Sequence, residues 1–158
     1  AARTGGPFVY SQPIIIPTDD RPSKFETNLL MTTSAIVFNL AIAHHLDSVQ
    51  QGNDPRLLEK AVLCYEYSFH LSEVYRDDHA GSCMYYTMAI LNNLGACHRS
   101  LGQGKLADKT FSTLLTSLLY LQTSTAEKSP MNLEAFFGNV SYLAFPSSTR
   151  NMSIARAA

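Results

Sequence analysis

The sequence has few charged residues and no marked excess of either sign. Of its 158 residues, 12 are basic and 13 are acidic, and charged residues make up 16% of the chain. A balanced charge provides no basic field of the kind that binds nucleic acid or an anionic membrane surface. Uninterrupted apolar runs extend over only a few residues, which predicts that no helix inserts into a membrane. The length and the 46% apolar content suit one domain with a buried core.

Cysteine is also scarce, and the three that occur do not suit a disulfide framework. Cys64, Cys83 and Cys97 are odd in number and lie in apolar, helix-like surroundings. Buried, reduced thiols are therefore expected, and with them a reducing, intracellular compartment. Residues 1–6 contain no apolar stretch like that of a secretory signal. The sequence does not specify an organelle.

Sequence motifs for catalysis and metal binding are absent as well. The five histidines form no His-x3-His pair, the cysteines form no Cys-x2-Cys pair, and no Gly-x-Ser-x-Gly motif occurs. The stretch from Gly102 to Lys105 lacks the length of a phosphate-binding loop. We therefore predict no catalytic residues, no cofactor and no metal site.

The first 27 residues are predicted to form an extended arm. Proline recurs at positions 7, 13, 17 and 22, and each proline removes a backbone donor and disfavours helix before it. Between the prolines lie Phe8, Val9 and Tyr10 and then three isoleucines, Ile14, Ile15 and Ile16. A solvated tail rarely contains so many large apolar side chains. The arm is expected to lie on a surface, either of its own domain or of a partner.

After the arm, the apolar residues follow helical spacing throughout. Turn signals such as Asn53-Asp54-Pro55 separate the helical stretches, with Pro55 at the first position of a helix. The fold class predicted is all-α, with a helical domain over residues 28–145 and a tail at 146–158. The five expected helices cover residues 28–52, 56–75, 82–101, 105–122 and 131–143.

An internal repeat is the strongest pattern in the sequence. Asn39-Leu40-Ala41-Ile42-Ala43-His44 recurs as Asn93-Leu94-Gly95-Ala96-Cys97-His98, and Asn139 begins a partial third copy. In the second copy, Ala107 and Phe111 follow Gly95 at 12 and 16 residues. Tyr65 precedes Asn93 by 28 residues, and Phe111 precedes Asn139 by the same interval. Two equal intervals favour a true repeat over two unrelated hairpins.

These spacings resemble the tetratricopeptide repeat (TPR), in which small residues let paired helices approach and an aromatic residue fills the gap. The resemblance covers residues 30–145, with a period longer than the usual 34 residues. It implies a solenoid of antiparallel helical hairpins that acts as a non-catalytic scaffold and binds a peptide or protein in a concave groove. The string from Phe38 to Leu46 is also similar to uncharacterised helical-repeat proteins of diatom algae, which implies no activity.

The resemblance places the first helix of each pair along the groove, with Leu40 and Leu94 as equivalent buried positions. An asparagine amide can pair with the donor and acceptor of a peptide bond, so a row of three would hold an extended backbone. The asparagines could instead bond the neighbouring helix and one another. His45 and Arg99 are expected to select an acidic or polar ligand side chain. The predicted groove residues are Asn39, Asn93, Asn139, Phe38, Ile42, His45, Asn92, Arg99 and Tyr142.

The fifth predicted helix is apolar around most of its circumference, so another surface must cover it. The candidates are the arm, a second copy of the chain or a foreign partner, and a homo-oligomer is compatible with the sequence. The alternative function is accordingly a small structural subunit fixed in a larger protein assembly. Its interface residues would be Ile14, Ile15, Ile16, Phe136, Phe137 and Phe145.

Overall fold

The computed structural model describes residues 8–15, 25–75, 80–124 and 133–141. Within these ranges every regular element is a helix, as predicted, and there is no strand. Its five helices are α1 (Phe25–Gln50), α2 (Pro55–Tyr75), α3 (Ala80–Ser100), α4 (Gly104–Ser124) and α5 (Leu133–Val140). The first helix begins slightly before the predicted boundary at residue 28, and residues 8–15 have no regular secondary structure.

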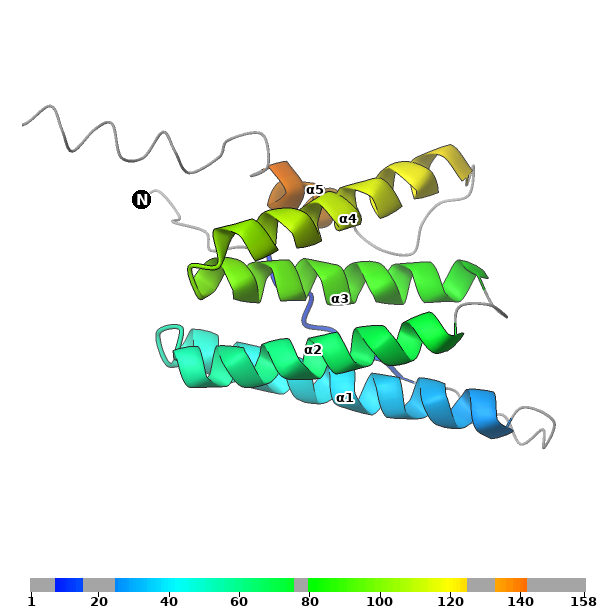
Figure 1. Cartoon of the computed structure of the whole chain (residues 1–158), viewed down its shortest axis with the longest axis horizontal. Helices are drawn as coiled ribbons and strands as arrows, with labels where there is room; N and C mark the ends of the chain where they lie inside the picture. The colour runs from blue at the N-terminus through cyan, green and yellow to red at the C-terminus, as the bar shows by residue number, and fades with distance from the viewer. Residues whose placement is uncertain (1–7, 16–24, 76–79, 125–132, 142–158) are drawn as a thin grey trace, which may run out of the picture.

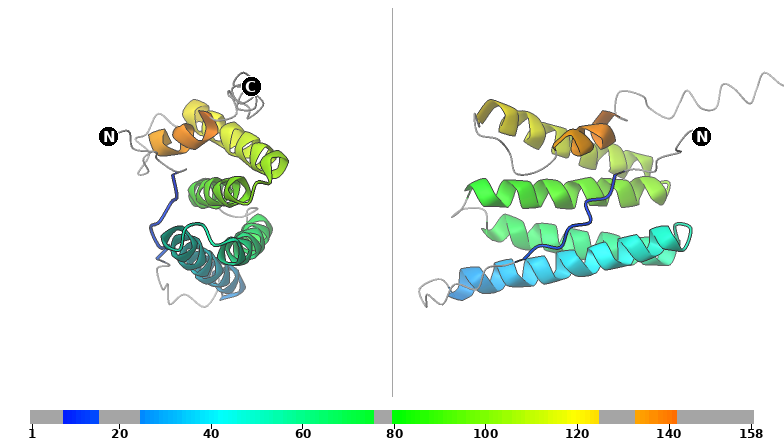
Figure 2. Two further views of the ribbon diagram at one scale, coloured as in Figure 1. Left: turned by 90° about the vertical axis from the view of Figure 1, so that its left-hand side faces the viewer. Right: turned by 180° about the vertical axis from the view of Figure 1, so that it is seen from behind.

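Successive long helices run antiparallel and follow one another across the molecule (Figure 1). The main contacts join neighbours in the sequence: α1 packs on α2, α2 on α3, and α3 on α4. The short helix α5 packs against both α4 and α3. Helix α3 therefore lies in the middle of the molecule, whereas α1 lies at one edge (Figures 1 and 2).

Two tight turns connect the helices of the α1–α2 and α3–α4 pairs. Gly102 has a φ of 73°, the left-handed conformation that glycine adopts without a steric penalty. Its N–H donates to the carbonyl of Arg99 and the N–H of Gln103 donates to that of His98, which together form a Schellman motif. Before α2, the Asp54 carboxylate accepts the N–H of Arg56, and Pro55 occupies the first helical position as predicted.

The apolar core consists of two clusters that share α3. One cluster joins α1, α2 and α3, and the other joins α3, α4 and α5. Every residue of α3 from Tyr86 to His98 is buried, which requires neighbours on all sides of this helix. Gly95 shows how tightly the second cluster packs, since a Cβ there would lie 2.6 Å from the Phe111 ring. The small residue and the aromatic residue of the repeat pattern therefore do pack together.

Helix α1 corrects two expectations. Leu40 is 49% exposed whereas Leu94 is 8% exposed, so the two positions are not equally buried. The stretch Leu29–Gln50 is also long and apolar enough, by length and composition alone, to span a membrane, with a mean hydropathy of 1.5. The exclusion based on uninterrupted apolar runs was therefore too strict, although core helices of soluble proteins pass the same test.

Candidate functional site

The three asparagines at the start of the repeat copies, Asn39, Asn93 and Asn139, all bind the chain's own N-terminal segment. We call these the asparagine row, and residues 8–15 the arm segment. Each amide accepts the N–H and donates to the carbonyl of one arm residue. The pairs are Asn139 with Phe8 (2.9 and 2.7 Å), Asn93 with Tyr10 (2.8 and 2.9 Å) and Asn39 with Ile14 (2.9 and 3.1 Å). The amide pairing expected for an extended backbone is thus present.

The arm segment crosses three alternate helices in the reverse of their order in the sequence. Phe8 is held at α5, Tyr10 at α3 and Ile14 at α1. Figure 2 shows the segment passing along one side of the molecule from α5 to α1. The three bonded residues are even-numbered, so they share one side of an extended chain. The asparagine row therefore forms hydrogen bonds with the same edge of the backbone at three points.

Asn92, next to Asn93 on α3, joins the row into a buried network. Its Nδ2 donates to the Phe8 carbonyl (3.1 Å) and to Asn93 Oδ1 (3.1 Å), and its Oδ1 accepts from Asn139 Nδ2 (2.8 Å). Asn93 Nδ2 also donates to the hydroxyl of Tyr65 (3.0 Å). The two alternatives left open by the sequence therefore coexist, because the asparagines bond one another and also hold an extended backbone.

Aromatic contacts supply the apolar part of the arm's binding surface. The Phe8 ring meets Phe136 of α5 edge-on, with centroids 5.7 Å apart. The Tyr10 ring stacks on Phe136 (6.2 Å) and also approaches Phe38 of α1 (6.4 Å). Burial raises the pKa of Tyr10, as expected for a phenol moved out of water. Phe38 therefore contributes to the surface beneath the arm segment.

His45 corrects the prediction of a ligand-selecting side chain. It is 2% exposed, and its Nδ1 lies 3.4 Å from the hydroxyl of Tyr65 and 3.4 Å from Sγ of Cys97. Burial lowers the pKa of His45 to about 4 and raises the pKa of Cys97 to about 12, and it also raises that of Tyr65. His45 is thus a neutral core residue. It lies behind the row and is linked to Asn93 through Tyr65.

The other predicted groove residues have different positions. Ile42 belongs to the α1–α2–α3 core and is 6% exposed. The guanidinium of Arg99 lies over the ring of Phe111, 4.9 Å from its centroid, so it is directed at α4 rather than at the arm segment. The expectation that Arg99 selects a ligand side chain is therefore not supported. Tyr142 lies outside the described residues.

The residues predicted as a partner interface are partly used within the chain. Ile14 packs against the α1–α2–α3 core, and Phe136 is 1% exposed beneath the arm segment. These two residues are therefore not free for a foreign surface as the sequence suggested. Ile15 is 86% exposed, and Phe137 is partly buried. Ile16 and Phe145 lie outside the described residues.

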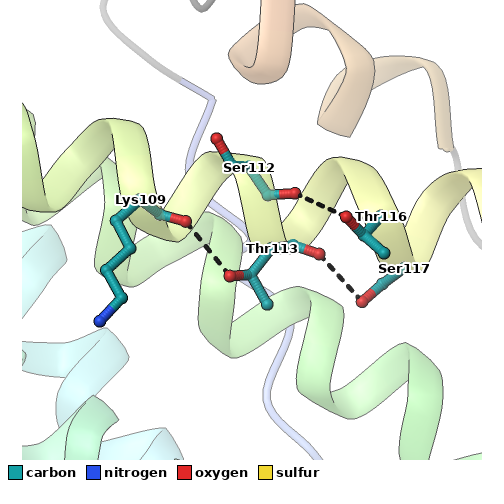
Figure 3. A pocket seen from close by; sticks show the side chains of 5 residues that line it. All are labelled: Lys109, Ser112, Thr113, Thr116 and Ser117. Carbon is teal, nitrogen blue, oxygen red and sulfur yellow. Dashed lines mark hydrogen bonds between the residues drawn. The ribbon is translucent and has the colours of Figure 1, made fainter.

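Apart from the arm surface, an open depression of about 490 Å³ lies along α4 (Figure 3). Its hydroxyls are used by the helix itself. Thr113 donates to the carbonyl of Lys109, Thr116 to that of Ser112, and Ser117 to that of Thr113. The lining residues are Lys109, Ser112, Thr113, Thr116 and Ser117. No cluster of three or more potential metal ligands occurs among the residues that the structure describes.

Tyr65 is the participant that sequence reasoning missed. It is fully buried, and its hydroxyl joins Asn93 to His45. The 28-residue interval to Asn93 marked Tyr65 as part of the repeat, but the pattern assigned it only a packing role. At the corresponding position of the next copy stands Phe111, which has no hydroxyl. Where Asn93 bonds Tyr65 in addition to the arm, Asn139 therefore bonds Asn92.

Comparisons with known proteins identify no family for this chain. No protein-family model matches it, and neither a curated protein nor a solved structure is significantly similar to it.

Proposed function

We propose that the chain is a TPR-like helical solenoid that acts as a non-catalytic protein-interaction module and holds an extended segment of a partner in a groove along the asparagine row. The observation that carries this proposal is the set of three two-bond contacts between the row and the main chain of residues 8–15. Such contacts recognise an extended backbone, whatever side chains it carries. The close packing of Gly95 with Phe111 supports the TPR-like arrangement.

A peptide-display selection on the full chain tests this function. A random library of 12-residue peptides is selected on wild-type protein and on an Asn39→Ala/Asn93→Ala variant. We expect peptides that bind the wild type and lose at least about tenfold in affinity for the variant, since a lost pair of hydrogen bonds is worth about 1 to 3 kcal/mol. Far-UV circular dichroism establishes that the variant remains helical.

The selection is repeated on a Phe8→Ala/Tyr10→Ala variant, whose own arm binds less well. If neither this chain nor the wild type yields peptides that depend on the asparagines, the proposed groove function is wrong.

The alternative, a structural subunit of a larger assembly, is favoured by a separate observation. Large apolar side chains are exposed along α1, where Leu29, Ile36 and Leu40 are about half exposed or more, and Ile15 is 86% exposed. Such a surface suits a permanent neighbour. Analytical ultracentrifugation of the purified chain distinguishes the two functions, because a subunit that lacks its neighbours self-associates and an independent module remains monomeric.

A further inference from the structure

The arm segment provides a template for what the asparagine row can bind, because its residues make different kinds of contact. Phe8, Tyr10 and Ile14 each give both main-chain groups to an asparagine, and each also packs its side chain on the domain. Tyr10 and Ile14 are partly buried and Phe8 is 38% exposed, and the intervening residues Ser11, Gln12 and Pro13 are exposed. The contacts therefore define three anchor positions, with one residue between the first two and three between the second and third.

The side-chain contacts at the first two anchors favour aromatic residues. Phe136 makes a T-shaped contact with the Phe8 ring and a stacked contact with the Tyr10 ring, at centroid distances of 5.7 and 6.2 Å. Phe38 approaches the second ring from the opposite end of the surface. Aromatic pairs in these geometries contribute about 0.5 to 1.5 kcal/mol beyond their buried area. An aliphatic residue at either position would lose these ring contacts.

The third anchor is an aliphatic residue. Ile14 packs against the α1–α2–α3 cluster, and its main chain bonds only to Asn39 within the row. That cluster contains aliphatic residues and also the aromatic residues Phe38 and Tyr65. A branched aliphatic side chain four residues after the second aromatic residue therefore fits this position.

Charge plays no part in these contacts. Residues 8–15 contain no charged residue, and the side chains that bond or stack on them are asparagines and phenylalanines. A charged side chain at an anchor would be removed from water without an opposite charge, which is costly. Binding that rests on neutral hydrogen bonds and apolar contacts also depends little on salt.

The arm segment bonds directly to the buried asparagine network. Asn92, Asn93 and Asn139 are at most 2% exposed, and each bonds a main-chain group of the arm segment. Removing the segment without replacing it would break the main-chain hydrogen bonds of these amides and leave Asn93 its bond to Tyr65 and the bonds of the amides to one another. The site therefore favours exchange of one extended segment for another.

From this geometry we infer, on the basis of the proposed function, that the partner is an uncharged extended protein segment with two aromatic residues two positions apart and a branched aliphatic residue four positions further on. The arm segment occupies the same site as an intramolecular competitor. A partner binds only by displacing the arm segment, so it must bind the site more strongly than the tethered arm does.

The factor by which the arm lowers the apparent affinity of a partner can be estimated, because few residues separate the arm segment from α1 in the sequence. Residues 16–24 join the arm segment to α1 in the sequence. A tether of this length gives an effective concentration on the order of 1 mM. If the free segment binds with a dissociation constant of about 10 μM, the arm weakens a competing ligand about 100-fold. Substitutions that weaken binding of the arm should recover most of this lost affinity for the competing ligand.

The test measures binding of one defined probe to the full-length protein. The probe is a fluorescein-labelled synthetic peptide with the sequence of residues 7–16, and binding is followed by fluorescence anisotropy at 50 and 500 mM NaCl. The proteins are wild type, Phe8→Ala/Tyr10→Ala, and the matched control Ser11→Ala/Gln12→Ala, which changes exposed arm residues. A second peptide carries alanine at both aromatic positions, and a third carries aspartate at both.

We expect the Phe8→Ala/Tyr10→Ala protein to bind the first peptide at least about tenfold more tightly than wild type and the control protein do, since the competitor is weakened. The affinity should change less than about twofold between the salt concentrations. The alanine and aspartate peptides should bind at least about tenfold more weakly than the first, because they lose the ring contacts. In wild type, an excess of the first peptide should remove the hydrogen-exchange protection of the Tyr10 amide, a readout that needs no variant.

The contrary results are distinct from failure of the proposed function. Equal affinity of wild type and Phe8→Ala/Tyr10→Ala for the first peptide, or unchanged Tyr10 protection at saturation, would show that the arm is no competitor. Equal binding of all three peptides would overturn the assigned pattern while the groove function stands. If light scattering finds a wild-type dimer that Phe8→Ala/Tyr10→Ala abolishes, the occupant is the arm of a second copy and the proposal is wrong.

Discussion

The two copies of the Asn-Leu-x-x-x-His pattern have similar sequences and different surroundings. In α3, Asn93 is fully buried, Leu94 is nearly so, and His98 bonds Gln103. In α1, the matching asparagine and histidine are half-buried and Leu40 is 49% exposed. The difference arises because α3 has helices on both sides whereas α1 lies at the edge. A repeated motif therefore gives the direction of each side chain, and the neighbouring helix determines whether that side chain is buried.

The leucines of the two copies should show the largest contrast. Leu94→Ala is expected to lower the free energy of unfolding by about 3 kcal/mol, because it opens a cavity in the core. Leu40→Ala should cost less than about 1 kcal/mol, since half of the side chain is already in water. Urea denaturation followed by far-UV circular dichroism measures both values. Similar costs would show that α1 is covered in solution.

Alanine substitution of the two asparagines should also destabilise the α3 copy more than the α1 copy, with smaller losses in the free energy of unfolding. Asn93→Ala removes bonds to the Tyr10 main chain, to Tyr65 and to Asn92, and should cost about 2 to 3 kcal/mol. Asn39→Ala removes only the two bonds to Ile14 and should cost about 1 kcal/mol. Urea denaturation again provides the measurement. A larger cost for Asn39 would mean that the edge of the row, not its centre, anchors the arm.

His45, in the edge helix but inside the core, should make stability depend on pH. Its pKa is lowered from 6.5 to about 4 by burial, so between these values the unfolded chain binds a proton that the folded chain does not. Stability therefore falls as pH decreases through this window, by about 2 kcal/mol between pH 6.5 and 5. His45→Gln should flatten the profile over this range, which urea denaturation at several pH values measures. Equal slopes for His45→Gln and the wild type would refute the assignment.

Gly95 tests the close approach of α3 and α4. Alanine there places a Cβ 2.6 Å from the buried Phe111 ring, and the repacking should cost about 1 to 2 kcal/mol. Gly138→Ala in α5 is the matched control, because among the described residues no atom outside the backbone of α5 lies within 4 Å of its new Cβ. The control should be neutral or stabilising by up to about 1 kcal/mol through helix propensity. Thermal melts of both variants provide the comparison, and equal effects would indicate a looser α3–α4 contact.

Much of the fold was predictable because its signals are local. Apolar spacing predicted five helices, and Asp54-Pro55 and Gly102 predicted two of their ends. The row of Asn39, Asn93 and Asn139 was predictable from the repeat alone. The role of His45 was not predictable. His44 and His45 are adjacent and point about 100° apart on the helix, and the sequence does not show which of the two faces the core.

The amino-acid sequence by itself determined the helices, their caps and the recurrence of an amide at one position in three of them. Only the tertiary structure decided what those amides bind, because residues 8, 10 and 14 reach them from up to 131 positions away in the chain. Local propensity contains no information about such long-range pairing. It depends on which surfaces remain uncovered once the helices have packed, and on the free energy gained when an apolar arm covers them.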